Sequence, residues 1–215
     1  MLKLINVKKY YSSFLALDIP ELTIGEGLWW LRGENGSGKT TFLKLVAGLH
    51  PFNGDIIIDD EYSIKKQRLH FTRRINYAEA EPLYPSFLTG RDLVHLYCKT
   101  KDGNIDEAVE NLRQLHVLAA YEKAVGTYSS GMVKKLSLVL AFIGHSRFIL
   151  LDEPLITIDV QALEVVCRMI GDKHKQGVSF IITSHQSVQK EQLMFSGAML
   201  AAGNTITLIP HEDSK

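Results

Sequence analysis

Hydrophobic positions along this chain fall into patterns that predict β-strands. Near-continuous apolar runs are typical of strands in a parallel sheet that is covered on both faces. Three such runs lie at residues 28–31, 148–151 and 178–182. Looser alternation, or a preceding turn, predicts further strands at 2–7, 17–24 and 55–59. A hairpin is expected over 199–209, with its turn at Gly203 and Asn204.

Helices are predicted between these strands. Four segments have apolar residues at helical spacing or form a longer buried stretch, and they lie at 41–49, 87–117, 133–143 and 160–174. In the second segment the apolar residues Ile105, Ala108, Val109, Leu112 and Leu115 would line one face of an amphipathic helix. The mixture of strands and helices predicts the α/β class.

The segment between the first apolar run and the first helix matches the phosphate-loop pattern G-x-x-x-x-G-K-[ST]. Such a loop aims backbone N–H groups and a helix N-terminus at a bound phosphate. Lys39 would reach the β- and γ-phosphates of a nucleotide, and Thr40 would place its hydroxyl on Mg²⁺. The alternative is a glycine-rich turn before a core helix, which the downstream motifs disfavour. The residues expected to bind nucleotide here are Gly33, Asn35, Gly36, Ser37, Gly38, Lys39, Thr40 and Thr41.

Polar residues follow two of the apolar runs directly. Carboxylates at the end of a central strand lie where ligands bind in open α/β sheets. Asp152 is therefore expected to hold Mg²⁺, and Glu153 to orient or deprotonate the attacking water. A helix-capping acid is the alternative for this pair. His185 follows the second run and is a candidate γ-phosphate sensor, although a single histidine more often has a structural role.

Composition limits the classes of protein that this chain could belong to. The 24 basic and 24 acidic residues give a formal net charge of zero, which argues against a broad nucleic-acid surface. No apolar stretch approaches the ~18 residues of a membrane span, and residues 1–9 are too charged for a signal peptide. Cys98 and Cys167 are expected to be reduced thiols, as in a cytosolic protein. A local basic run, at 65–68 and 73–74, favours a solvated strand face over a site for lipid headgroups.

One further motif precedes the helix at 133–143. In the sequence from Tyr128 to Met132, two hydroxyl residues and a glycine stand where a helix would begin. These residue types are good helix caps and good anion ligands. By itself this motif predicts only a cap.

The order and spacing of the motifs resemble those of the nucleotide-binding subunit of an ATP-binding cassette (ABC) transporter, over nearly all of the chain. This resemblance implies ATP and Mg²⁺ as cofactors and a second ATPase subunit, identical or different. It also implies that Ser129, Ser130 and Gly131 bind the ATP held by that second subunit. Tyr10 corresponds to an aromatic residue that stacks on adenine, with Tyr11 as the alternative. Asp159 corresponds to an aspartate at the dimer contact.

The chain departs from the family pattern at three places. The usual Leu-Ser-Gly-Gly-Gln signature is Tyr-Ser-Ser-Gly-Met here, a variant similar to those of bacterial exporter-type cassettes. Ile156 replaces a small serine in the D-loop. The loop that normally carries a glutamine has none: Ala80 falls at that position, and Glu79 or Glu81 could substitute for it.

The resemblance further implies one ABC ATPase domain over 1–215. It would consist of a P-loop NTPase core, an antiparallel β-subdomain and an inserted helical subdomain over about 86–133. A separate integral-membrane subunit would dock near 79–87. The chain would then lie on the cytoplasmic face of the membrane. Its ATP hydrolysis would power transport, and the resemblance favours export over import. Alternatives are a soluble ABC-type ATPase of DNA repair or translation, a regulatory nucleotide-binding module, and a nucleoside-type kinase. The cargo stays open.

Overall fold

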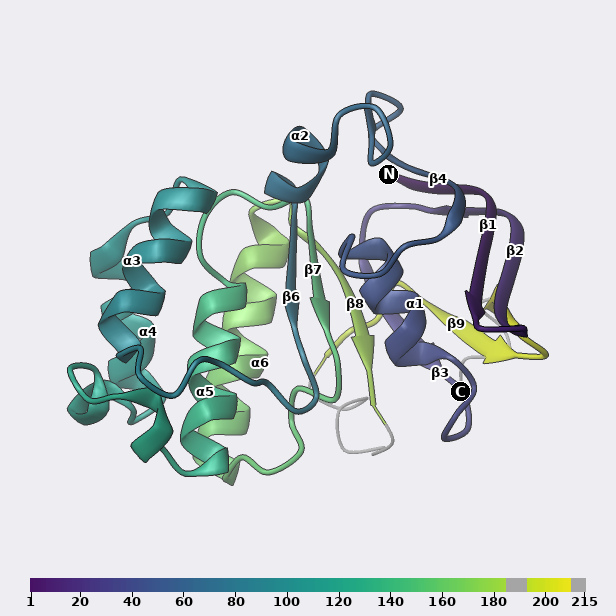
Figure 1. The fold of residues 1–215 in the computed structure, drawn as a ribbon. Coiled ribbons are helices and arrows are strands. Elements are labelled where there is room, and N and C mark those ends of the chain that lie inside the picture. The colour runs from purple at the N-terminus through teal and green to yellow at the C-terminus, as the bar shows by residue number, and fades with distance from the viewer. Residues whose placement is uncertain (185–192, 210–215) are drawn as a thin grey trace.

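The computed structural model describes residues 1–184 and 193–209, which form two β-sheets and the α-helices that pack against them (Figure 1). The strands are β1 (Leu2–Tyr11), β2 (Phe14–Ile24), β3 (Leu28–Arg32), β4 (Asn53–Ile58), β5 (Tyr62–Ser63), β6 (Ile75–Ala78), β7 (Phe148–Leu151), β8 (Ser179–Thr183), β9 (Gly197–Ala202) and β10 (Thr205–Ile209). The α-helices are α1 (Lys39–Val46), α2 (Arg68–Arg73), α3 (Gly90–Lys101), α4 (Ile105–Gln114), α5 (Ser130–Ala141) and α6 (Val160–Lys175). Two short 3-10 helices, Leu118–Ala120 and Val125–Thr127, lie between α4 and α5.

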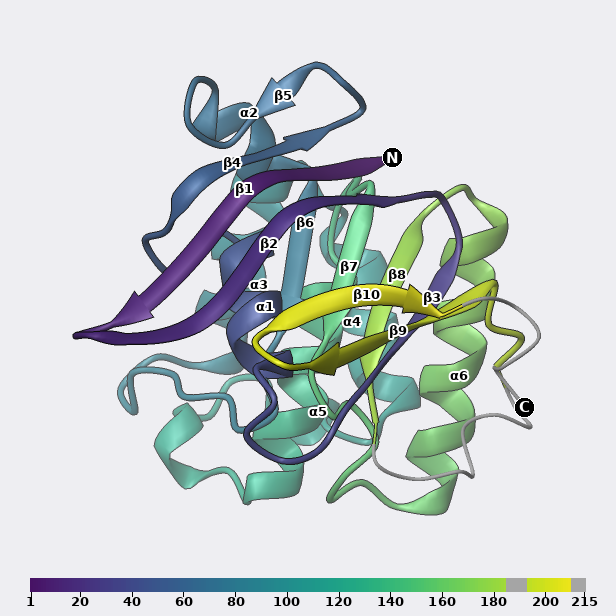
Figure 2. The same ribbon diagram turned by 90° about the vertical axis from the view of Figure 1, so that its right-hand side faces the viewer.

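The larger sheet has the strand order β10-β9-β3-β8-β7-β6. Its strands from β9 to β6 pair in parallel, whereas β10 pairs antiparallel with β9 at the edge. Every residue of β7 and β8 is buried, which confirms the interpretation of these apolar runs as central parallel strands. The β9–β10 hairpin turns at Gly203 and Asn204, as its sequence predicts, and Figure 2 shows it in front of β3.

The smaller sheet is antiparallel, with the order β2-β1-β4-β5. Helix α1 lies between the two sheets (Figure 1). Its side chains Phe42, Leu43, Leu45 and Val46 belong to one buried cluster with Leu2 of the small sheet and Phe148 of the large one. The helix that begins at the phosphate loop is therefore fixed from both sides.

Helices α3 to α6 cover the opposite face of the large sheet (Figure 1). Helix α3 begins with a capping box in which the Thr89 side chain accepts from the Asp92 N–H, and Asn104 caps α4. Helix α5 extends from 130 to 141, so it begins three residues before the predicted start at Val133. This earlier start puts the hydroxyl motif on the first turn of the helix, because Ser129 serves as its cap.

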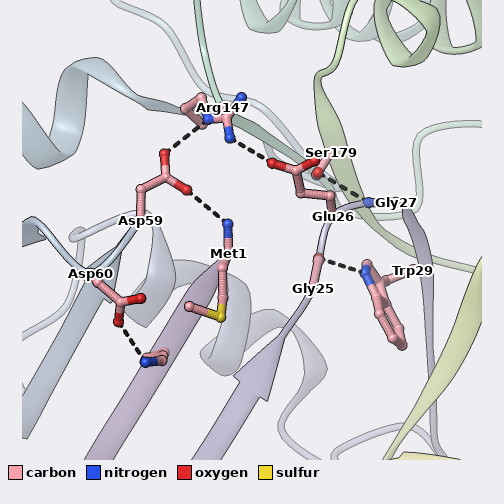
Figure 3. Close-up of polar contacts among 10 residues, drawn as sticks. Met1, Gly25, Glu26, Gly27, Trp29, Asp59, Asp60, Arg147 and Ser179 are labelled. Carbon is pink, nitrogen blue, oxygen red and sulfur yellow. Dashed lines mark hydrogen bonds and ion pairs between the residues drawn. The ribbon is translucent and has the colours of Figure 1, made fainter.

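An arginine joins segments at the strand ends of the two sheets (Figure 3). Arg147, just before β7, donates from Nε to Asp59 Oδ2 at 2.9 Å and from Nη2 to Glu26 Oε1 at 2.6 Å. Asp59 follows β4, and Glu26 lies in the turn between β2 and β3. In that turn the Gly27 N–H donates to Ser179 Oγ at 3.1 Å, at the start of β8. These contacts therefore join the two sheets at the amino ends of β3, β7 and β8, whereas the phosphate loop follows the carboxyl end of β3.

The interpretation of the basic run as a strand face is wrong. Residues 68–73 form helix α2, and 65–67 lie in the turn that leads to it. The Arg68 guanidinium donates to the Gly48 carbonyl. The Cζ of Arg74 lies 3.4 Å from the centroid of the Tyr62 ring. Lys65, Lys66, Arg68 and Arg73 are nevertheless exposed, so the run is solvated as expected, although it does not lie on a strand.

Candidate nucleotide-binding site

The phosphate loop connects β3 to α1 and has a backbone that requires glycine. Gly36 and Gly38 have φ values of 80° and 98°, in the region that L-residues rarely adopt. Gly38 is the residue before α1, and no side chain caps the helix there. The first N–H groups of α1 are consequently left to face the loop, as in other anion-binding helix N-termini.

Lys39 is held inside this loop. Its side chain is only 8% exposed, and Nζ donates to the Gly33 carbonyl at 2.8 Å and the Glu34 carbonyl at 2.9 Å. Burial lowers the pKa of Lys39, while the nearby Glu153 and Asp152 carboxylates oppose that shift. The ammonium is therefore positioned at the loop by the chain itself.

Asp152 lies at the end of β7 in a defined hydrogen-bond network. The Thr183 hydroxyl donates to Asp152 Oδ1 at 2.7 Å and accepts from the Glu153 N–H at 2.8 Å. This bridge exists because β7 and β8 are parallel neighbours, so their carboxyl ends meet. Tyr77 Oη lies 3.4 Å from Asp152 Oδ2, and burial followed by the charge of Asp152 raises the pKa of Tyr77. Tyr77 therefore stays a neutral donor toward the carboxylate.

The phosphate loop and the strand-end carboxylates line one cavity of about 310 Å³. The residues that line it are Asn35, Gly36, Gly38, Lys39, Thr40, Thr41, Asp152 and Glu153. All of them are predicted site residues. Gly33 and Ser37 line a neighbouring cavity of about 840 Å³, on the side of the loop that faces β9.

The other predicted site residues lie outside this cavity. Tyr10 is half-exposed near the end of β1, and Ser129 and Ser130 are exposed at the N-terminus of α5. Asp159 caps α6 through the Ala162 N–H and pairs with Lys135 Nζ at 2.6 Å. His185 lies outside the described residues.

The loop that lacks a glutamine follows β6, beside β7. Glu79 Oε2 lies 3.4 Å from Lys44 Nζ, on helix α1. Since Lys44 is one helical turn beyond Thr40, Glu79 is the candidate whose carboxylate contacts the phosphate-loop helix. Glu81 is exposed.

Two residues with clear positions in this region are missed by sequence reasoning. Thr183 bridges Asp152 and Glu153, and Lys134 on α5 is 1% exposed with its Nζ among backbone carbonyls. Lysine is seldom fully buried, so its residue type gave no signal of this position. The partners of Lys134 could not be found from the sequence either, because they come from distant segments.

A glycine-rich loop around a lysine, a helix N-terminus without a side-chain cap and a strand-end aspartate define a P-loop nucleotide-binding protein. The sequence model of the ABC transporter family matches residues 17–156. The chain belongs to this family. No helix in the described part of the chain combines the length and apolarity needed to cross a membrane.

Comparison with known proteins agrees with this assignment. Human ATP-binding cassette sub-family A member 2 is 30% identical over 214 residues, which are 94% of this chain but only 9% of that protein. The cytochrome c biogenesis ATP-binding export protein CcmA of Aliivibrio fischeri is 29% identical and is matched over 93% of its length, against 87% of this chain. The solved ATP-binding subunit of an ABC transporter superposes with a TM-score of 0.88 at 19% identity, covering 99% of this chain and 91% of that one. The fold is therefore that of an ABC ATPase.

Proposed function

We propose that this chain is the ATP-hydrolysing subunit of an ABC transporter. The observation that carries the proposal is the single cavity shared by the phosphate loop and by Asp152 and Glu153. Phosphoryl transfer to water needs groups that hold the phosphates and a group that orients the water, and these residue types can supply both. The similarity to an export protein favours export, with the cargo selected elsewhere.

In the proposed reaction the chain positions ATP and the attacking water. Backbone N–H groups of the loop and of the first turn of α1 bind the phosphate oxygens, and Lys39 adds a positive charge. Glu153 orients the water and accepts its proton. His185 is proposed to contact the γ-phosphate, and Tyr10 to stack on adenine.

The residues of the cavity suit Mg²⁺. This ion is usually bound by one or two carboxylates together with substrate phosphates and water. Asp152 supplies a buried carboxylate oriented by Thr183, and Thr40 supplies a hydroxyl at the start of α1. Bound Mg²⁺ would neutralise charge on the phosphates.

A second ATPase subunit is proposed to complete the site. Ser129, Ser130 and Gly131 do not line the cavity of their own chain. Ser129 and Ser130 are exposed at the N-terminus of α5, where a helix end favours an anion. We propose that they bind the γ-phosphate of ATP held by the other subunit, with Asp159 near the contact.

The membrane-embedded partner is proposed to dock in a groove of about 480 Å³ that includes Glu79, Pro82, Leu83 and Tyr84. The groove runs between α1, α2, β6 and α3, and Leu83 on its rim is 92% exposed. An exposed apolar rim of this kind is typical of a protein interface. We propose that 1–215 forms one ABC ATPase domain, with a helical subdomain over about 86–133, peripheral on the cytoplasmic face of the membrane.

Steady-state hydrolysis of ATP tests the enzymatic part. Glu153→Gln is expected to lower kcat by about 10²–10⁴-fold while ATP still binds, because the general base is removed. Glu164→Gln, on the exposed face of α6, is the matched control and is expected to keep the wild-type rate. A wild-type rate in Glu153→Gln would show that Glu153 is not the base.

The transport part is tested by capture of the tagged Glu153→Gln protein from detergent-solubilised membranes with ATP and Mg²⁺. Mass spectrometry is expected to find a stoichiometric polytopic membrane protein. Recovery of soluble partners, ribosomes or nucleic acid alone would contradict the transporter assignment and favour a soluble ABC-type ATPase.

A further inference from the structure

Lys134 lies in the interior of the molecule and contacts three backbone carbonyls. Its side chain is 1% exposed, and Nζ donates to Glu79 O at 2.8 Å, Ala80 O at 3.0 Å and Asp152 O at 3.1 Å. A lysine ammonium has three donors and no acceptor, so these three carbonyls satisfy it completely. A buried ammonium without such partners would be strongly unfavourable.

The three carbonyls come from two segments far apart in the sequence. Glu79 and Ala80 are 55 and 54 residues from Lys134, in the loop after β6, whereas Asp152 is 18 residues away, at the end of β7. Lys134 itself is on the second turn of α5, whose first turn carries the exposed hydroxyl motif. One side chain therefore connects the signature helix, the glutamine-less loop and the strand end that bears Asp152 and Glu153.

The same contacts link the nucleotide cavity to the groove. Glu79 lines the groove, and Asp152 lines the cavity. The next residue on the helix, Lys135, pairs with Asp159 at the start of α6. The loop after β6 has no glutamine, and the Nζ of Lys134 joins its Glu79 and Ala80 carbonyls to the Asp152 carbonyl. This link adds to the bond from the Asp152 N–H to the Ala78 carbonyl, at 3.0 Å, at the end of β6.

We propose that Lys134 is a positioning residue for ATP hydrolysis. By holding the Asp152 carbonyl and the loop at 79–80 together, its ammonium sets the position of the adjacent Glu153 relative to the γ-phosphate. A shift of α5 or of the groove then reaches Glu153 through this side chain. The inference rests on the proposed ATPase function.

The test compares Lys134→Met, which keeps the length of the side chain but removes its donors, with Lys134→Arg, which keeps charge and donors. Lys123→Met is the matched control, because Lys123 is exposed between α4 and α5. We expect Lys134→Met to lower kcat about 10- to 100-fold, as a misplaced catalytic group does, and to leave the KM for ATP within about threefold. Lys134→Arg is expected to recover most of kcat.

Amide hydrogen exchange gives a second readout, independent of activity. In Lys134→Met we expect faster exchange at the amides of residues 79–81 and 152–153 and unchanged exchange in the phosphate loop. If this variant does not fold, Lys134→Gln, which keeps two N–H donors, takes its place. It is expected to show faster exchange at the same residues, with a smaller increase in rate.

Three results would overturn the inference. A folded Lys134→Met with wild-type kcat and exchange would show that the contact has no positioning role. Equal losses of kcat and ATP affinity in Lys134→Met and Lys134→Arg, in proportion to lost stability, would show a purely structural role. An inactive wild-type protein would overturn the proposed function as well, so the wild-type rate is measured first and separates the two failures.

Discussion

The N-termini of α1 and α5 both carry a short motif of small residues, but the chain treats them differently. Helix α1 follows Gly38, which has φ 98° and offers no side-chain cap. Helix α5 follows Ser129, whose Oγ accepts from the Met132 N–H at 3.2 Å. The first helix end is left open toward a cavity of its own chain, whereas the second is already partly satisfied and faces outward.

This difference indicates how the two proposed anion sites can differ in strength. An uncapped helix N-terminus can give several N–H groups to a phosphate, and in α1 the buried Lys39 lies beside it. At α5 the Ser129 hydroxyl accepts a bond from its own helix, so its O–H hydrogen remains available to donate. The first end suits tight binding within the chain, and the second suits a reversible contact with another molecule.

The largest expected effect comes from removing the cation at the open helix end. Lys39→Ala is expected to reduce ATP hydrolysis at least about 10²-fold, because the phosphates lose a buried, oriented charge. A phosphate-release assay measures this loss, and Lys123→Ala is the control at an exposed lysine. Activity within twofold of the wild type would show that α1 does not bind the reacting phosphates.

Alanine substitutions at glycine should separate the two ends by stability. Gly38→Ala is expected to lower the free energy of unfolding by about 1–3 kcal/mol. The residue has a left-handed φ, and the added Cβ would lie 3.1 Å from Leu17 Cδ2. Gly131→Ala, inside α5, meets only the Thr157 carbonyl at 3.4 Å and is expected to be neutral or to stabilise by up to about 1 kcal/mol. Urea unfolding measures both.

Gly131→Ala should also affect function. Gly131→Ala is expected to weaken ATP-dependent dimerisation of the Glu153→Gln protein, because a methyl group would stand where the second ATP approaches. Analytical ultracentrifugation with ATP measures this effect. Undiminished dimerisation would contradict the proposed role of the α5 end.

Removing the cap of α5 should have a moderate effect. Ser129→Ala is expected to lower the free energy of unfolding by about 1 kcal/mol, since the Met132 N–H loses its acceptor. Ser130→Ala is the matched control, one residue inside the helix. Equal stabilities for the two variants would show that the cap contributes nothing measurable.

The smallest effect is expected at the start of α6. The Lys135 ion pair, followed by the Ala162 N–H bond, lowers the pKa of Asp159 to about 2 from the ordinary 3.8. This stabilisation is present above pH 4 and is lost as the pH falls through 2. Because the carboxylate is exposed, Asp159→Asn should cost less than about 1 kcal/mol at pH 7, and less again at pH 3. Urea unfolding at both pH values measures the difference, and a constant cost would exclude the charge as its cause.

Local sequence signals predicted the open helix end well. The glycines, Lys39 and Thr40 are contiguous, and glycine conformations and a strand–loop–helix order follow from the residues themselves. The strands at 148–151 and 178–182 were equally clear, because strands covered on both faces contain almost only apolar residues. The position of Asp152 beside the loop follows from these two predictions.

Signals that depend on packing were interpreted less well. The basic run at 65–74 has the composition of a solvated surface, and most of its basic residues are exposed, but 68–73 is helical and not a strand. The role of Thr183 was missed because threonine is ordinary in a strand, and only the register between β7 and β8 gives it two partners.

The sequence by itself determined the phosphate loop and the central strands at 148–151 and 178–182, because each depends on residues that are close along the chain. The order and spacing of the motifs along the chain indicated the family. Helix α2 and strand β6 were not predicted. Only the tertiary structure decided which helix end is open to its own cavity, and which carbonyls surround Lys134. Those contacts join residues 18 to 55 positions apart. Burial makes them necessary, since a charged group removed from water must find its hydrogen-bond partners wherever the fold places them.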